Sequence, residues 1–137
     1  MKTVKYAPKD IAKPFLDALA IKFSKLKPTT QKAIQEQVLS GKMHLLVAHD
    51  NNKLKGGMVV QGKRTEYGPT AFIYGIFGTS IADPKYYDQA VKILKMAGFS
   101  YIQGFGQPAS LKNYKQAGLP FKETKKTENG IFFGSGL

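Results

Sequence analysis

Cysteine and tryptophan are absent from the 137-residue sequence, and arginine occurs once, as Arg64. The lack of cysteine excludes disulfides and thiolate metal sites, which fits an intracellular protein. No apolar run reaches 18 residues, so we expect no membrane span. Lys2 and Lys5 precede a mixed polar stretch instead of an apolar core, so we expect no signal peptide either.

Acidic residues are scarce: nine face 21 basic residues, which gives a formal net charge of +12. Three interpretations of this charge stay open. It can be a lysine-rich solubilising surface, a means of nonspecific contact with nucleic acid or acidic proteins, or a local attraction for the phosphates of a cofactor. The lysines are scattered along the chain, which favours the first. Lysine also reads bases poorly compared with arginine.

Aromatic and aliphatic residues are plentiful, with nine Phe and seven Tyr, so a packed core is expected. The length suits one domain over residues 1–137. Apolar runs predict six strands, at 2–7, 43–50, 54–61, 71–79, 99–105 and 131–133. Helical spacing predicts four helices, in 10–27, 29–40, 84–97 and 108–117. The polar stretches 62–69 and 122–130 are interpreted as a loop and a charged turn. These elements predict an α/β domain with a mixed, mostly antiparallel sheet. Strands 71–79 and 99–105 should be parallel neighbours, because the helix between them forces a crossover connection.

Capping and turn residues predict where several elements begin and end. Asp10 is suited to N-cap the first helix, and Thr29 or Thr30 the second. Asp83 and Pro84 together fit the N-cap and first position of the third helix. Asn51 and the following Asn predict a tight hairpin turn between strands 43–50 and 54–61.

The stretch from Lys92 to Phe121 carries the most specific pattern. After the strand at 99–105 come Gln107, Ser110, Tyr114 and Gly118-Leu119, at intervals of three, four and four residues. The stretch resembles the second half of the GNAT acyltransferase fold, in which these positions hold Asn, Ala, Tyr and Gly-Phe. The order of elements is similar to the GNAT order along nearly the whole chain.

The resemblance implies an N-acyltransferase that uses acetyl-CoA or another acyl-CoA and an amine. Tyr114 then matches the family's general acid, which protonates the leaving thiolate, and Gln107 would hold the pantetheine through its amide. Tyr114 can equally be a helix aromatic packed on the sheet, and Gln107 a plain loop residue before a proline.

The family's pyrophosphate loop matches residues 75–87, so the resemblance implies cofactor contacts from Gly78, Thr79, Ser80 and Lys85. Free backbone N–H groups at a helix start hold phosphates. This sequence departs from the family there, because the usual glycine motif is missing. In addition, Pro84 removes a donor and the neighbouring aspartate places a negative charge at the helix start. A capped structural helix is the other interpretation of this segment.

A general base is needed to deprotonate the amine, and Glu66 is the candidate that we select. Asp50 at the hairpin turn is an alternative. His44 and His49 titrate in a suitable range. They are expected to face opposite sides of one strand, which excludes a metal site made from that strand alone. No other metal-ligand motif is present, so no metal is expected.

Three functions stay open. The first is a GNAT-like N-acyltransferase. The second is a GNAT-shaped protein without the CoA site, such as a phage internal virion protein, that works by binding assembly partners. The third is a nonspecific nucleic-acid-associated basic module. An intracellular location is expected, or the virion if a phage encodes the chain. In a binder, Asp83 should cap its own helix and Phe77, Tyr86 or Phe105 should fill the gap between the two strands that the family splays apart.

Overall fold

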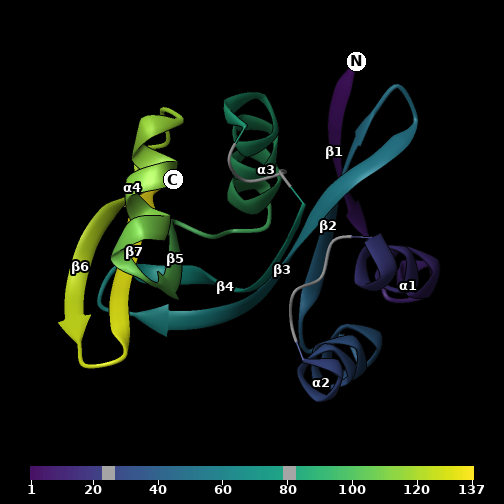
Figure 1. Ribbon diagram of the computed structural model, residues 1–137, viewed down its shortest axis with the longest axis horizontal. Coiled ribbons are helices and arrows are strands. Elements are labelled where there is room, and N and C mark those ends of the chain that lie inside the picture. The colour runs from purple at the N-terminus through teal and green to yellow at the C-terminus, as the bar shows by residue number, and fades with distance from the viewer. Residues whose placement is uncertain (23–26, 79–82) are drawn as a thin grey trace.

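The computed structural model describes residues 1–22, 27–78 and 83–137. Its elements in chain order are β1 (Lys2–Ala7), α1 (Ala12–Lys22), α2 (Pro28–Leu39), β2 (His44–Asp50), β3 (Lys53–Thr65), β4 (Gly68–Gly78), α3 (Pro84–Met96), β5 (Tyr101–Gly106), α4 (Pro108–Gln116), β6 (Lys122–Thr127) and β7 (Gly130–Gly136). The strands form one sheet in the order β1-β2-β3-β4-β5-β7-β6 (Figure 1). All neighbours are antiparallel except β4 and β5. The predicted fold class is therefore confirmed.

Helices lie on both faces of the sheet. α1 and α2 cover one face beside β2 and β3, and α3 and α4 lie on the other (Figure 1). Side chains alternate between the two faces along each strand, so each face has its own core. The core under α1 and α2 includes Leu19, Ile34 and Phe77. The core under α3 and α4 includes Leu94 and Phe121.

Two predicted loops turn out to be strands. Residues 62–69, predicted as a polar loop, are the end of β3 and the start of β4, joined by a short turn at Glu66 and Tyr67. Residues 122–130, predicted as a charged turn, hold β6, so the sheet has one strand more than the six predicted. Both stretches are polar because they lie at the exposed tip or the edge of the sheet, where burial does not select apolar residues. Lysine on an edge strand also discourages pairing with other chains.

Two predicted helix starts are wrong and two are right. α1 begins at Ala12, and Asp10 lies in the turn before it. α2 begins at Pro28 and has Lys27 at its N-cap without a side-chain hydrogen bond, so neither threonine caps it. α3 and α4 begin at Pro84 and Pro108 as predicted. Proline suits the first helical position because its missing N–H has no partner there anyway.

A tight two-residue turn joins β2 to β3 as an antiparallel hairpin. Asn51 and Asn52 both have positive φ, of 51° and 67°, as a two-residue hairpin turn of this kind requires. A bulge follows, because Lys55 has no partner on β2. At Gly57 an added Cβ would lie 2.8 Å from Cδ1 of Leu19, so α1 packs directly on this strand. The bulge therefore lies directly before Gly56, and the close approach of α1 falls at Gly57.

Candidate functional site

The centre of the candidate site is the place where β4 and β5 diverge. The two strands are parallel, as predicted, but they pair over three residues only, from Thr70 with Tyr101 to Phe72 with Gln103. Beyond that point β4 leads to α3 and β5 leads to α4 (Figure 1). Within the described residues, Ile73–Gly78 of β4 pairs with β3 on one side and with no strand on the other. This edge offers backbone N–H and C=O groups to a ligand.

A bulge shapes the same part of β4. Gly75 pairs with Val59 and Ile73 pairs with Val60, so Tyr74 is an extra residue without a partner. A bulge bends its strand and redirects its backbone groups, and bulges are frequent beside functional sites. Here the bulge coincides with the point at which β4 turns away from β5.

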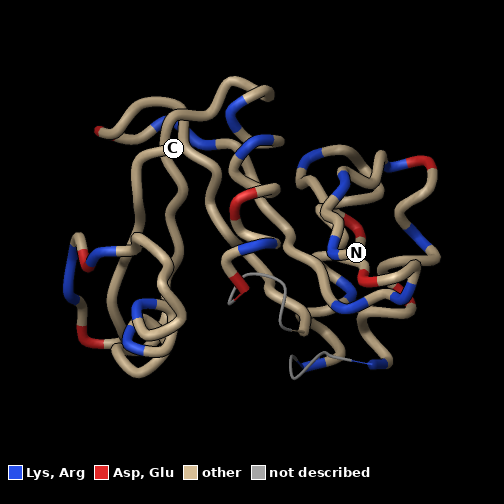
Figure 2. Tube along the Cα trace, turned by 90° about the horizontal axis from the view of Figure 1, so that it is seen from above, with Lys and Arg blue, Asp and Glu red and all other residues tan. Residues whose placement is uncertain are grey.

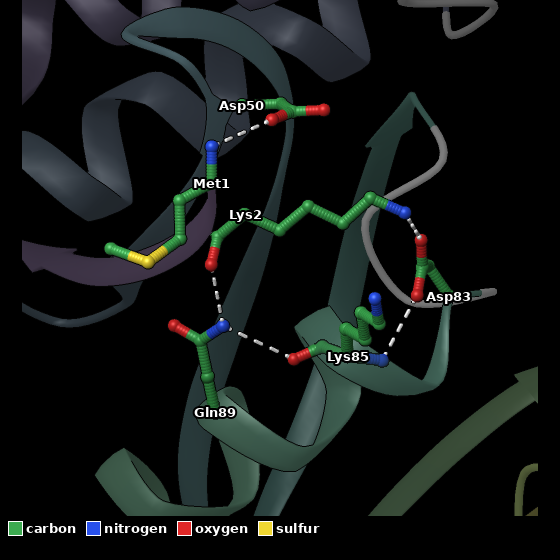
Figure 3. Close-up of polar contacts among 6 residues, drawn as sticks. All are labelled: Met1, Lys2, Asp50, Asp83, Lys85 and Gln89. Atoms are coloured by element: carbon green, nitrogen blue, oxygen red, sulfur yellow. Dashed lines mark hydrogen bonds and ion pairs between the residues drawn. The ribbon is translucent and has the colours of Figure 1, made fainter.

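The start of α3 is closed by an acidic side chain. The Asp83 carboxylate accepts a hydrogen bond of 2.9 Å from the Lys85 backbone N–H, and it forms an ion pair with the Lys2 ammonium (Figure 3). The predicted N-cap is therefore confirmed. The carboxylate occupies the Lys85 N–H, a group that an anion would contact at a helix start.

Hydrogen bonds join strand β1 to α3 beside this cap. The Gln89 side chain accepts a hydrogen bond of 2.9 Å from the Val4 backbone N–H. It also donates to the Lys2 carbonyl oxygen at 2.9 Å (Figure 3). The terminal ammonium of Met1 lies 3.3 Å from the Asp50 carboxylate. A polar hollow of ≈ 490 Å³ lies here, lined by Met1, Lys2, Asp50, Lys85 and Gln89. The hollow is therefore lined by cations and by the Asp50 carboxylate.

Asp83 is expected to contribute to stability in a pH-dependent way. Its hydrogen bond with Lys2 lowers its pKa below the usual 3.8, with the Lys85 N–H helping, although burial opposes the shift. A lowered folded-state pKa gives stability that is present above the unfolded pKa and is lost as the pH falls through the folded one. We expect Asp83→Ala to cost about 1 kcal/mol at pH 7, as loss of an N-cap does. That difference should narrow below about pH 4 in urea titrations.

The matched control is Asp83→Asn, which keeps a capping oxygen and removes the charge. It should cost less than Asp83→Ala at pH 7. Equal losses for both variants would show that the cap contributes nothing beyond the ion pair.

Tyr114 lies on α4 against the core of the sheet. Its ring packs on Phe121 and Phe133, with 5.8 Å between ring centres in both cases. Burial raises the pKa of its hydroxyl, so the group is protonated at neutral pH. The hydroxyl makes no hydrogen bond to any of the described residues. The ring thus has a packing role, while the hydroxyl is available as a proton donor.

Tyr87 is a residue that the sequence analysis did not assign to a site. It is buried on α3, and its ring meets Phe121 edge-on with centres 5.4 Å apart. Burial raises the pKa of its hydroxyl to about 12, and the hydroxyl has no hydrogen-bond partner among the described residues. A buried hydroxyl without a partner is costly. Two tyrosine rings, one from α3 and one from α4, therefore flank the same phenylalanine.

The other predicted site residues are only partly brought together. Gln107 precedes α4, and its Nε2 donates to the Asn129 carbonyl oxygen at 3.0 Å, which ties α4 to the β6–β7 turn. Gly78 ends β4 with a φ of +69°. Glu66 is exposed in the β3–β4 turn, at the opposite end of β4 from α3. Thr79 and Ser80 lie outside the described residues.

The two histidines lie on opposite faces of the sheet, as predicted. His44 contacts Tyr6, with Nδ1 3.2 Å from the Tyr6 hydroxyl. His49 lies against the Phe15 ring of α1, and burial together with the nearby Lys5 lowers its pKa. In the part of the chain that the structure describes, no three His, Cys, Asp or Glu side chains gather as metal ligands would. No helix of that part is long and apolar enough to cross a membrane.

Solved structures show what this arrangement is similar to. An IAA acetyltransferase from Bacillus cereus matches with a TM-score of 0.66 and 16% identity over 100% of both chains. A GNAT-family acetyltransferase from Streptococcus pneumoniae matches with a TM-score of 0.61 and 13% identity, again over 100% of both chains. The ribosomal-protein-S18-alanine N-acetyltransferase of Escherichia coli matches with a TM-score of 0.63 and 12% identity, over 99% of this chain and 94% of its own.

No family model and no curated protein matches the sequence. The similarity to solved structures, at sequence identities of 9–17%, shows that the chain has the fold of the GNAT acetyltransferases along its whole length. The resemblance inferred from the sequence is confirmed at the level of the fold.

Proposed function

We propose that the chain is an N-acyltransferase that moves an acetyl or longer acyl group from acyl-CoA to an amine. The divergence of β4 and β5 carries the proposal. It leaves the edge of Ile73–Gly78 without a strand partner, and an extended acyl-pantetheine arm can hydrogen-bond to such an edge as an added strand does. The solved structures of the same fold are acetyltransferases, which supports this assignment.

In the proposed reaction the amine nitrogen attacks the thioester carbonyl carbon. A C–N bond forms and the C–S bond breaks. The departing sulfur takes a proton from the Tyr114 hydroxyl, which burial keeps protonated at neutral pH. The proposed base, Glu66, stands at the far end of β4, so the proton of the amine reaches it only through water. Tyr87 adds a second buried hydroxyl on the α3 side that a ligand could engage.

The phosphates are proposed to lie at the start of α3, near Gly78 and Lys85. Thr79 and Ser80, which lie outside the described residues, are proposed as further phosphate contacts. Phosphate binding there requires the Asp83 carboxylate to yield, because it occupies the helix start. Lys2 and Lys85 lie beside it and can attract the anion once the carboxylate moves. Gln107 is proposed to contact the pantetheine at the end of β5.

The same cap favours a second candidate, a GNAT-shaped protein that binds partners without a cofactor. Its Asp83 would stay in place as a structural N-cap. Three side chains are expected to fill the gap in such a protein. Two of them are buried elsewhere, and the third is exposed. Phe77 belongs to the core under α1 and α2, and Tyr86 lies against β1 and β2. Phe105 is 41% exposed on the sheet face opposite α3 and α4.

A thiol-release assay tests the proposed reaction. Because the chain has no cysteine, every thiol that reacts with a chromogenic disulfide comes from CoA. We expect amine-dependent release from acetyl-CoA, with the acetylated amine found by mass spectrometry. Release that does not depend on an added amine, or no release across primary amines of varied charge and size, would contradict the proposal.

A further inference from the structure

One half of the sheet carries a face that no described helix covers. α1 and α2 lie beside β2 and β3, and neither reaches β5, β7 or β6 (Figure 1). On this uncovered face, four aromatic rings run across β4, β5 and β7, each in contact with the next. In order along the row they are Tyr74, Phe72, Phe132 and Phe105, with 5.1, 6.5 and 4.9 Å between successive ring centres.

The rings are accessible. Tyr74 is 37% exposed and Phe105 is 41% exposed. Phe72 and Phe132, in the middle of the row, are half-buried. A contiguous aromatic surface on a protein usually marks a binding site. We call these four rings the aromatic row.

A hollow of ≈ 450 Å³ continues the same face toward β6. The Tyr101 ring stacks on Tyr67, with centres 4.2 Å apart and planes 11° apart, and both rings line the hollow. The Tyr101 ring lies over Gly134, where an added Cβ would clash with the ring. Thr124 also lines the hollow, and its hydroxyl is buried without a partner among the described residues. The hollow thus combines aromatic walls with an unused polar atom.

Lysines border the aromatic row and the hollow. The Lys63 ammonium stands over two rings of the row, 4.5 Å from the centre of Phe72 and 5.0 Å from that of Tyr74. Lys125 and Lys122 of β6 pair with Phe132 and Gly134, so their side chains share this face. All three lysines are exposed. Glu123 also lines the hollow, and Glu66 lies near Tyr101.

We propose that this face binds single-stranded nucleic acid. Bases stack on exposed aromatic rings whatever their sequence, and lysines contact the backbone phosphates. An exposed sheet with aromatic rings and bordering cations is suited to that ligand. A second copy of the chain is disfavoured, because each copy carries +12 and would bring its own lysines to the contact. The basic residues spread along the rest of the chain would add long-range attraction (Figure 2).

The test uses fluorescence anisotropy with labelled 20-nucleotide oligo(dT) and oligo(U), and a DNA duplex of equal length as comparison. We expect both single strands to bind more tightly than the duplex, whose bases are not available for stacking. Affinity should fall steeply between about 50 and 200 mM salt. No binding at 50 mM salt, or equal affinity for the duplex, would overturn the proposal.

Paired variants separate stacking from charge. Tyr74→Ala with Phe105→Ala should weaken binding about tenfold or more without changing its salt dependence. The control pair, Tyr6→Ala with Ile21→Ala, removes exposed apolar side chains elsewhere and should bind as the unchanged protein does. If the Tyr74→Ala, Phe105→Ala variant binds as tightly as the unchanged protein, or differs only in its oligomeric state by light scattering, the face does not bind bases.

For charge, Lys63→Gln with Lys125→Gln should flatten the plot of log affinity against log salt by about 1.4, which corresponds to two phosphate contacts on a single strand. The control pair, Lys32→Gln with Lys95→Gln, removes the same charge from α2 and α3. Equal slopes for the two pairs would show that only the net charge matters, which would also overturn the proposal. Circular dichroism melting confirms that each variant is folded.

Discussion

Tyr114→Phe is expected to lower the rate of acetyl transfer by about 10²-fold or more and to leave acetyl-CoA affinity nearly unchanged. The substitution removes one hydroxyl, which the proposed reaction uses only to protonate the leaving sulfur. The ring keeps its contacts with Phe121 and Phe133. Because the hydroxyl has no hydrogen-bond partner among the described residues, the melting temperature should hardly change. Turnover and calorimetric affinity, measured on the same preparation, check both parts.

Tyr6→Phe is the matched control, since it removes a tyrosine hydroxyl from β1, on the edge of the sheet away from α4. It should keep full activity. If Tyr114→Phe loses affinity and rate together, the hydroxyl contributes to binding and not to proton transfer. If it changes neither, Tyr114 is a packing residue alone, as the alternative interpretation of the sequence has it.

Gly78→Ala is expected to destabilise the fold by about 3 kcal/mol, since it combines an unfavourable backbone angle with a steric clash. The φ of Gly78 is +69°, and an added Cβ would lie 2.3 Å from the Lys55 carbonyl oxygen and 3.0 Å from Cα of Gly56. Both atoms belong to the backbone of β3 and cannot move aside without breaking the β3–β4 pairing. Urea unfolding of the unliganded protein measures the loss.

Gly98→Ala separates the two causes. Gly98 has a φ of +97° but no atom within 4 Å of an added Cβ, so this variant carries the backbone cost without the clash. It should cost about 1 kcal/mol. Equal losses at the two glycines would mean that β3 yields easily at Lys55. A large loss at Gly78 without ligand would mean that this glycine is first a structural requirement of the hairpin, whatever it contributes to a cofactor.

The elements that local chemistry specifies could be predicted from the sequence. Asp83 followed by Pro84 determines the start of α3 within two residues, and Asn51-Asn52 determines the hairpin turn. The parallel pairing of β4 and β5 followed from the helix between them, because such a connection must cross over the sheet.

The stretches that fold through contacts with distant residues could not be predicted. β6 has the sequence KETKKT, in which no apolar alternation remains because an edge strand buries little. Glu66 was interpreted as part of a loop, since nothing local distinguishes the tip of a long hairpin from a polar connection. The sequence predicts helices in 10–27 and 29–40, whereas Pro28 between them opens α2.

In the candidate site, too, the features specified by local sequence could be predicted, and those that depend on distant contacts could not. Tyr114 was found by its spacing in a motif. The ion pair of Asp83 with Lys2 joins residues 81 positions apart, so only the packing of β1 on α3 reveals it. Tyr87 looks like any inward-facing helix residue in the sequence, and its unpaired hydroxyl becomes visible only once its neighbours are known.

Titration of the unliganded protein with acetyl-CoA in a calorimeter tests the central claim most directly. The account predicts saturable heat with one site per chain, and a protein stabilised by about 2.7 kcal/mol when the free ligand reaches about 100 times its dissociation constant. Asp83→Asn should bind at least as tightly, because it removes the carboxylate that competes with the phosphates at the start of α3. No heat and no rise in melting temperature for either protein would contradict the account and leave the second candidate, a GNAT-shaped binding protein.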